Sequence, residues 1–468
     1  MSFSKSIRRR VAAGRLVFWT ACWLAASVSA QKVTIRVVTY NIEDDINGAT
    51  TPLPGLISPS GGGTVQQGGV LEGIGEEILG NDPAQPLDLL ALQETTSNPA
   101  TVAPIVTGLN AFYGAPGLYA MSTYQGTESG GDTADGNGPN ALVYNTKTLQ
   151  LLASVPVDPA GGTGQLGSVS GEYREVMRYE LALAGVPPTA ATEFYIYVSH
   201  YKSGTTFADL TDRTGEAQII RNDEANNLPA NARVLYVGDY NISASSETSY
   251  QIMLAAAAPN GIAQGQGIDP MNPSGVTTIN WATSTTSANL LSQETEEDYD
   301  LRYRDDLQVM TTNVYYGVAG GLALVPGTYH VFGNNGSTPY YGNVNSGSDT
   351  ALNDLAPGSP IPASALYRDL TNASDHLSVV ADYTLPAPPL LLTIASGTNQ
   401  ASWKNLIFSP LLPEHAYTVQ FSTHLAGGLW LPLTNYALPS TTNGSQVTIT
   451  DTNALSSQEF YRVEISGP

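Results

Sequence analysis

Six short polar clusters stand at the ends or starts of apolar, β-branched runs in the first 385 residues. They are Asn41-Ile42-Glu43, Leu92-Gln93-Glu94, Ser199-His200, Gly238-Asp239-Tyr240-Asn241, Arg304-x-Asp306 and Ser374-Asp375-His376. Carboxylate and amide oxygens are the ligands that hard divalent cations prefer, and histidine transfers protons near neutral pH. A chain that repeatedly ends strands in these residue types is building one polar site over a sheet edge. The clusters therefore predict metal binding combined with acid–base catalysis.

Each cluster taken alone also has a purely structural interpretation. Asp239 and Asn241 could cap a turn, because such side chains bond their own backbone there. Ser374-Asp375-His376 could simply begin a helix or strand, and His200 could be a structural histidine. Glu94 is harder to explain in this way, because burying a carboxylate without a partner is costly. The order and identity of all six clusters together favour a functional site.

This order of motifs resembles the endonuclease/exonuclease/phosphatase superfamily, over roughly residues 33–383. The superfamily includes nucleases of the pancreatic DNase type, apurinic-site endonucleases, sphingomyelinases and inositol-phosphate phosphatases. The resemblance implies an α/β (α+β) fold, a four-layer sandwich of two packed, mainly antiparallel sheets flanked by helices. It also implies a hydrolase that acts on phosphate ester bonds, with its site at one edge of the sandwich.

The metal in such a site is expected to be Mg²⁺, with Mn²⁺ or Ca²⁺ as alternatives. Glu94 is the main predicted ligand, Asn41 supports it, and Asp375 and Glu43 are further candidates. A cation held there would neutralise the phosphate and stabilise the leaving oxygen.

The remaining site residues are predicted to carry the proton transfers. His376 is the expected general base, because its ordinary pKa lies near neutrality. Asp306 matches the position that fixes the histidine tautomer in the family, and Asp239 would align the water or the leaving group. Asn241 would donate to a phosphoryl oxygen, and His200 would stabilise the transition state or protonate the leaving oxygen.

Several functions stay open at this stage. The leading interpretation is a phosphodiesterase or nuclease that acts on DNA or RNA, and the alternatives are a sphingomyelinase-type enzyme or a phosphomonoesterase. A binding protein that has lost catalysis on the same fold is the alternative from another class. The sequence also leaves open whether Arg174, Lys202 or Arg213 contacts phosphate.

Short strands are expected to position these clusters. The predicted strands are Val33–Tyr40, Leu87–Gln93, Ala141–Tyr144, Phe194–Ser199, Val234–Val237, Leu307–Met310 and Leu377–Tyr383. Helical spacing of apolar residues predicts helices at Gly69–Leu79, Thr211–Asn227 and Glu247–Ala257. The polar stretches 49–68, 122–140 and 330–363 are expected to be surface loops.

The predicted catalytic unit comprises residues 31–385. The two ends of the chain differ from it in composition. Residues 1–30 have a basic start, an apolar run Leu16–Val28 and small residues before Ala30, which predicts a signal peptide cleaved near Ala30 and a secreted protein, extracellular or periplasmic. We expect no transmembrane segment. A Pro-rich linker, 386–392, precedes a predicted small β-sandwich at 393–468. That module resembles the "FYRV"-type C-terminal modules of secreted bacterial proteins and its partner stays open.

Composition limits the partners of the protein. The 468 residues include 41 Asp and Glu against 19 Lys and Arg, for a formal charge of −22. Removing the signal peptide would take away five of the basic residues and the single cysteine, Cys22. A chain this acidic is not expected to bind nucleic acid stably through a basic surface that releases counterions. We therefore expect a phosphodiester substrate, nucleic acid or phospholipid headgroup, to be turned over rather than stably bound.

Overall fold

A computed structural model describes most of the chain from Lys32 onward. The described residues are 32–44, 53–80, 83–124, 138–157, 176–283, 288–296, 300–318, 320–387, 390–396, 403–409, 411, 416–424, 429–433, 436–443, 446–452, 454 and 459–466. The predicted signal peptide lies outside this range. Within it, no helix combines the length and apolar character needed to cross a bilayer.

The first of two large sheets has β1 and β13 near its middle. Its order is β11-β13-β1-β2-β4-β3, with β12 paired to β13. The strands are β1 Lys32–Asn41, β2 Leu89–Gln93, β3 Tyr119–Met121, β4 Ala141–Asn145, β11 Ala323–Leu324, β12 His330–Val331 and β13 Val379–Pro386. β1 and β2 are parallel, and every other pair in the sheet is antiparallel.

The second sheet has the order β5-β6-β7-β8-β10-β9. Its strands are β5 Leu149–Val157, β6 Val176–Leu183, β7 Glu193–His200, β8 Val234–Asp239, β9 Gly267–Ile268 and β10 Asp306–Thr311. β7 and β8 are its parallel pair, and the other pairs are antiparallel.

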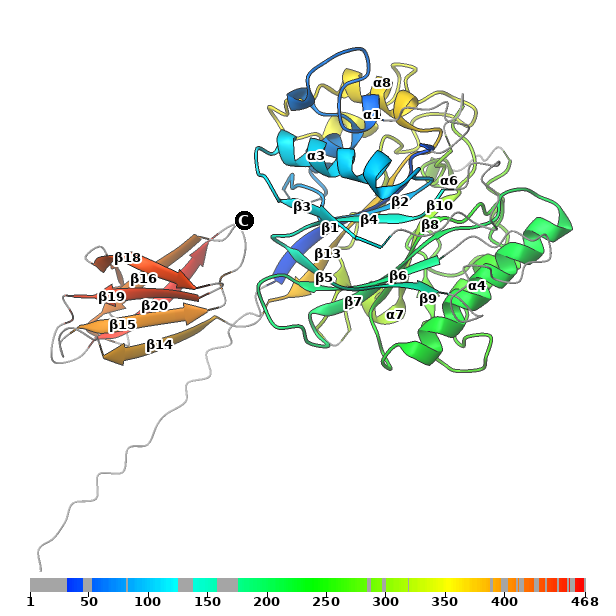
Figure 1. Ribbon diagram of the computed structural model, residues 1–468. Helices are drawn as coiled ribbons and strands as arrows, with labels where there is room; N and C mark the ends of the chain where they lie inside the picture. Colours follow the sequence, from blue (N-terminus) through cyan, green and yellow to red (C-terminus); the bar gives the residue numbers. More distant parts are fainter. Residues whose placement is uncertain are drawn as a thin grey trace, which may run out of the picture.

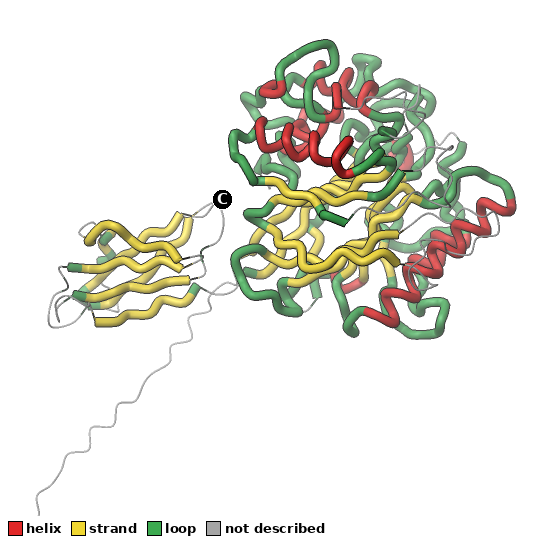
Figure 2. Tube along the Cα trace, viewed as in Figure 1, coloured by secondary structure: helices red, strands yellow, loops and turns green. Residues whose placement is uncertain are grey.

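Helices cover the outer faces of the two sheets (Figures 1 and 2). The α-helices are α1 Leu53–Leu56, α2 Val70–Gly75, α3 Ala103–Phe112, α4 Phe207–Asn227, α5 Thr248–Leu254, α6 Ala288–Leu291, α7 Thr312–Tyr315 and α8 Ala363–Ala373. Short helical turns are η2 Val65–Gln67, η3 Asn98–Val102 and η5 Ala351–Asp354. In Figure 1, α1, α3 and α8 lie over the first sheet and α4 lies over the second. The predicted four-layer arrangement is confirmed.

Alternation of side chains along the strands builds the layers. In β1, Ile35 and Val37 are buried in the core between the sheets, together with residues of β7 such as Ile196. Val38 and Tyr40 point the other way, into the core beneath the helices of the first sheet. Since successive side chains of a strand face opposite sides, a strand apolar on both faces must lie inside a layered sandwich.

The predicted strands are present, and the helix predictions differ mainly at their ends. α2 and α5 are shorter than expected, whereas α4 begins at Phe207, where Thr206 caps it by accepting a hydrogen bond from the Asp209 N–H. β5, β6, α3 and α8 were not predicted. The segment 330–363 was expected to be a surface loop, but five of its apolar side chains are buried in the core beneath the helices: Val331, Phe332, Val344, Leu352 and Ile361.

A buried arginine fastens α2 to the first sheet. The Arg36 guanidinium donates to both carboxylate oxygens of Asp382 at 2.9 and 3.1 Å. The same group donates to the carbonyl oxygens of Ile74 and Glu77 at 2.6 and 3.2 Å. The last turn of α2 is therefore held against β1 and β13.

Glu72 in α2 makes the stability of this layer depend on pH. Burial raises the pKa of Glu72 from 4.5 to about 8. Between these values the unfolded chain has lost a proton that the folded protein keeps, so the free energy of unfolding falls as pH rises. One such group contributes a slope of at most about 1.4 kcal/mol per pH unit. Glu72→Gln should remove this contribution, so its stability relative to wild type should rise from pH 5 to pH 8 in urea unfolding.

The matched control for this measurement is Glu76→Gln, a partly exposed carboxylate just beyond the same helix. Parallel stability profiles for wild type and Glu72→Gln across that pH range would contradict the prediction.

The C-terminal region consists of antiparallel sheets, in agreement with the predicted all-β tail. The strands are β14 Leu391–Ser396, β15 Lys404–Ser409, β16 Ala416–Ser422, β17 Leu431–Pro432, β18 Tyr436–Asn443, β19 Gln446–Asp451 and β20 Phe460–Ser466. They form one sheet of order β14-β15-β19-β18 and another of order β17-β16-β20. Leu406, Phe408, Val419 and Leu433 form their small core.

Candidate active site

Strand register brings the polar clusters to one edge of the sandwich. In the parallel pairs, Asn41 lies opposite Gln93 and His200 lies opposite Asp239. β10 starts at the same edge, with Asp306 opposite Asp239. Because carboxyl ends of parallel strands meet at one side of a sheet, both sheets present polar residues there. This edge is on the right-hand side of Figure 1, away from the end of β13.

Left-handed backbone turns aim several of these side chains. Glu43, Glu94 and Asn241 have φ values of +51°, +54° and +50°. Such values are uncommon for residues with a Cβ and concentrate at functional sites. Gly238 has a φ of +142°, and a Cβ placed on it would lie 1.8 Å from the Ser199 carbonyl oxygen. Only glycine therefore allows β8 to approach β7 closely just before Asp239.

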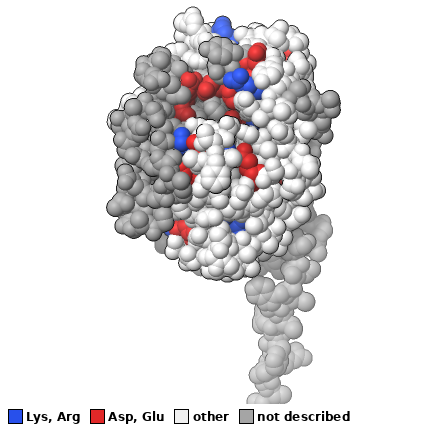
Figure 3. Space-filling model, turned by 90° about the vertical axis from the view of Figure 1, so that its right-hand side faces the viewer, with Lys and Arg blue, Asp and Glu red and all other residues white. Residues whose placement is uncertain are grey.

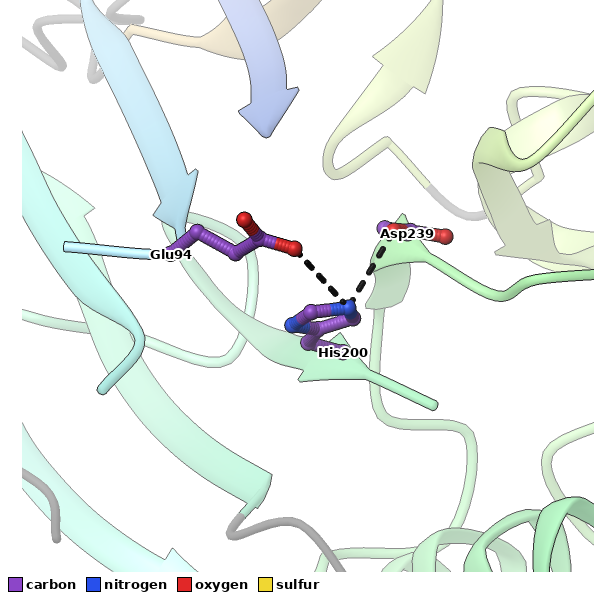
Figure 4. Close-up of side chains that lie close together, drawn as sticks. All are labelled: Glu94, His200 and Asp239. Atoms are coloured by element: carbon purple, nitrogen blue, oxygen red, sulfur yellow. Dashed lines mark ion pairs between the residues drawn. The ribbon is translucent and has the colours of Figure 1, made fainter. Parts of the chain in front are cut away.

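Glu94, His200 and Asp239 form a compact buried cluster (Figure 4). The His200 Nε2 lies 3.5 Å from Glu94 Oε1 and 3.2 Å from Asp239 Oδ2. One ligand atom from each of the three residues lies within 4.8 Å of the others, so the group could hold a metal ion. The three side chains are at most 10% exposed.

Asn41 stands between the two carboxylates of this cluster. Its Nδ2 donates to Glu94 Oε1 and Asp239 Oδ2, both at 3.0 Å. Its Oδ1 accepts the Glu43 N–H at 3.1 Å, which fixes the orientation of the amide. Asn41, predicted as a supporting metal ligand, thus contacts both carboxylates of the cluster through its amide nitrogen, and its part in metal binding stays a prediction.

His376 and Asp306 form the second part of the site. The His376 Nδ1 lies 2.7 Å from Asp306 Oδ2, and its Nε2 lies 3.5 Å from the Asn41 amide nitrogen. Burial by itself would lower the pKa of His376, but the carboxylates of Asp306 and Asp375 raise it well above its ordinary value. Burial raises the pKa of Asp306 to about 6, against the influence of the facing imidazole.

The other predicted site residues lie at the periphery of this cluster. Asp375 Oδ1 is 3.6 Å from His376 Nε2, and its side chain is 27% exposed. Glu43 is partly buried and binds Asn41 through its backbone N–H. Asn241 donates its backbone N–H to Asp239 Oδ1 at 2.9 Å and its Nδ2 to the Tyr201 carbonyl oxygen at 3.1 Å. All nine predicted residues thus gather at one edge.

Three supporting residues were missed by the sequence reasoning. The Thr295 hydroxyl accepts the backbone N–H groups of Asp305 and Asp306 at 2.9 and 3.1 Å. Burial and the nearby Asp239 raise the pKa of the Asp305 carboxyl well above its ordinary value. Asp269 accepts two hydrogen bonds from buried Arg304, at 2.6 and 2.8 Å. Asp305 is the middle residue of the predicted Arg304-x-Asp306 motif and could have been found from it, but Thr295 and Asp269 lie outside every predicted motif.

Of the cations considered for phosphate contact, Arg213 has a structural position. Its buried guanidinium donates to the carbonyl oxygens of Lys202 and Gly204 at 2.9 and 2.7 Å and pairs with Glu247 at 2.8 Å. It therefore holds the loop after His200. Lys202 donates its backbone N–H to Glu216 at 3.0 Å, and Arg174 lies outside the described residues.

The face that contains this edge is acidic. Figure 3 shows Asp and Glu side chains gathered around a hollow, with few Lys or Arg side chains among the described residues of that face. A negatively charged substrate approaching there meets repulsion unless a cation is present.

Comparison with known proteins identifies the family. The sequence profile of the Endonuclease/Exonuclease/phosphatase family matches residues 67–399. Asn41 and Glu43 precede the matched stretch. No curated protein matches the chain in sequence.

Solved structures with similar folds share little sequence with the chain. The human Nocturnin catalytic domain with bound sulfate is 17% identical, with a TM-score of 0.40, over 75% of this chain and 96% of that chain. D. rerio TDP2 with a single-strand DNA product is 12% identical, with a TM-score of 0.40, over 75% and 98%. ANGEL2, a 2',3'-cyclic phosphatase, in complex with adenosine-2',3'-vanadate is 15% identical, with a TM-score of 0.39, over 76% and 97%. The family profile covers most of the chain, which therefore belongs to the endonuclease/exonuclease/phosphatase family and is a hydrolase that acts on phosphate ester bonds.

Proposed function

We propose that the protein is a secreted, divalent-metal-dependent phosphodiesterase that hydrolyses nucleic acid with a water nucleophile. The observation that carries this proposal is the convergence of Glu94, His200 and Asp239 beside the His376–Asp306 pair. The carboxylates of the cluster offer ligands for a cation, His200 offers an acid beside them, and the His376–Asp306 pair offers a base held in one orientation. Together they are what hydrolysis of a phosphodiester by water requires.

The donor set fits a hard divalent cation, for which we propose Mg²⁺, with Mn²⁺ or Ca²⁺ as alternatives. Glu94 and Asp239 bring two buried carboxylates to the same Asn41 amide nitrogen. Like charges this close repel unless a cation or strong donors offset them. Mg²⁺ prefers oxygen ligands, so we assign Glu94 as its main ligand, with Asp375 and Glu43 as the acidic groups nearby. When bound, the metal supplies positive charge for the phosphate and for the leaving oxygen.

His376 takes the proton from the attacking water in this proposal. The neutral imidazole is the form that acts as base; in it we assign the proton to Nδ1, where Asp306 accepts the hydrogen bond, so that the lone pair is on Nε2. That nitrogen faces the Asn41 amide at the centre of the site. After proton transfer, the Asp306 carboxylate stabilises the imidazolium.

The opposite side of the site acts on the phosphoryl group. His200, when protonated, donates from Nε2 to a phosphoryl oxygen or to the leaving oxygen. Asp239 is held by Asn41 and by the Asn241 backbone, so it is oriented to align the water or the leaving group. Asn241 uses one amide hydrogen on Tyr201 and has a second one for a phosphoryl oxygen.

Secretion is supported by the sequence of the first thirty residues, with their basic start and apolar run before Ala30. We further propose that residues 393–468 are an accessory module of the "FYRV" type, outside the chemistry of the site.

Purified residues 31–468 test the proposal. They should hydrolyse a generic phosphodiester when Mg²⁺ or Mn²⁺ is present, and EDTA should abolish this activity. A panel of DNA, RNA, sphingomyelin and phosphorylated inositol identifies the substrate class. Activity that persists in EDTA would contradict the proposed metal dependence. A preference for sphingomyelin would contradict the proposed nuclease and support a phospholipid phosphodiesterase instead.

A further inference from the structure

Paired backbone segments around Glu296 and Arg302 connect the catalytic histidine to a group of aromatic side chains. Glu296 and Arg302 exchange both backbone hydrogen bonds, at 2.9 and 3.0 Å. Glu296 also forms an isolated bridge with His376. The three residues thus lie on three adjacent segments. Since neighbouring strands are about 4.8 Å apart, the backbones of Arg302 and His376 are about 10 Å apart.

A second loop extends this ladder by one step. Leu301 donates its N–H to the Gly342 carbonyl oxygen at 3.0 Å and accepts the Tyr341 N–H at 2.9 Å. The rings of Tyr340 and Tyr341 meet edge to face, with centroids 4.4 Å apart. Tyr341 is 53% exposed, so its ring is open to a ligand. We call Arg302, Tyr303, Tyr340 and Tyr341 the tyrosine platform.

The platform has a fixed geometry. The Arg302 guanidinium lies over the Tyr303 ring, 5.4 Å from its centroid, and binds Glu296 Oε1 at 2.7 and 2.9 Å. Tyr303 and Tyr341 have φ values of +51° and +62°. A left-handed backbone is costly for bulky residues and is found where the structure must present a side chain in one position. Two aromatic residues in one patch carry this strain.

We propose that the tyrosine platform is a base-binding subsite, which makes the substrate of the proposed phosphodiesterase a single-stranded nucleic acid. Bases stack on aromatic rings without regard to sequence, and an arginine among the rings adds a cation for the backbone. Stacking also supplies affinity that does not depend on a basic surface, which a chain of charge −22 lacks.

This inference rests on the proposed function. Comparing two substrates distinguishes failure of the inference from failure of the proposed function. One is a single-stranded oligodeoxyadenylate, and the other is a strand of the same length that carries abasic sites, with the same phosphates but no bases. Wild-type protein should have the higher kcat/KM on the strand with bases. Tyr341→Ala should lower the ratio of the two kcat/KM values about 5- to 100-fold. Tyr341→Phe, which keeps the ring, should retain the wild-type ratio.

Two further variants complete the experiment. Tyr341→Leu keeps apolar bulk without a flat ring and should lose the preference as Tyr341→Ala does. Tyr316→Ala is the matched control, because Tyr316 is 68% exposed but follows β10 and α7 at the end remote from Asp306. The base-binding role of the platform would be contradicted if Tyr341→Ala left the ratio of the two kcat/KM values unchanged. It would also be contradicted if Tyr341→Ala lost activity only on sphingomyelin vesicles. Failure of wild type to cleave either strand with Mg²⁺ or Mn²⁺ would instead overturn the proposed function.

Discussion

Replacing His376 by alanine is expected to lower kcat by about 10²- to 10⁴-fold, the range that a positioned general base contributes. The loss should fall on kcat more than on KM, because the ring acts on the water rather than on substrate binding. Asp306→Asn should also lower kcat, since its amide can donate to Nδ1 and so favour the tautomer without a lone pair on Nε2. Steady-state kinetics on a phosphodiester measures both effects, and circular dichroism checks the fold.

The matched control for this substitution is His330→Ala. His330 is also a histidine paired with a buried carboxylate, with its Nε2 at 3.1 Å from Glu77, but it lies on β12 outside the site. The kcat of His330→Ala should stay within about twofold of the wild-type value, as expected for a side chain remote from the reaction. A kcat for His376→Ala within tenfold of wild type would show that another residue is the base.

Glu94→Gln is expected to abolish most of the stabilisation that divalent metal gives to the fold. In wild type, metal at 100 times its dissociation constant should stabilise the fold by about 2.7 kcal/mol. The amide removes one anionic ligand, so most of that gain should be lost. Without metal the variant should be at least as stable as wild type, because Glu94 and Asp239 no longer repel each other across the Asn41 amide.

Thermal or urea unfolding with Mg²⁺, Mn²⁺ or EDTA measures this change without reference to activity. Glu193→Gln, at the opposite end of β7 from His200, is the control and should respond to metal as wild type does. A metal-induced shift of equal size in Glu94→Gln and wild type would remove Glu94 from the ligand set.

The sequence predicts the location of the site because its signals are local. A β-branched run followed by Asn, Asp, Glu or His indicates a strand end, and two parallel pairs are enough to gather such ends. The orientation of each side chain depends on contacts between distant segments. The contacts of the Asn41 amide with Glu94 and Asp239 require three strands to be in register, so sequence reasoning could not predict them.

Elements that the sequence reasoning missed have weaker local patterns. α8 follows a long polar segment, and its apolar residues Leu366 and Leu370 are recognisable as a buried stripe only once the first sheet is beneath them. Thr295 lies outside the strands and helices, and its role follows from hydrogen bonds to Asp305 and Asp306. Such contacts are set by tertiary structure, which local propensity does not encode.

The hydrogen bond from the Ser374 hydroxyl to the Asn41 carbonyl oxygen joins residues 333 positions apart. It lies beside the pairing of β1 with β13, the first and last strands of the catalytic unit. During synthesis, a chain that has not yet reached β13 has Glu94 and Asp239 but lacks His376. Contacts of such long range also form late in folding. Hydrolytic activity is therefore expected only after the last strand has docked, because only then does His376 join Glu94 and Asp239.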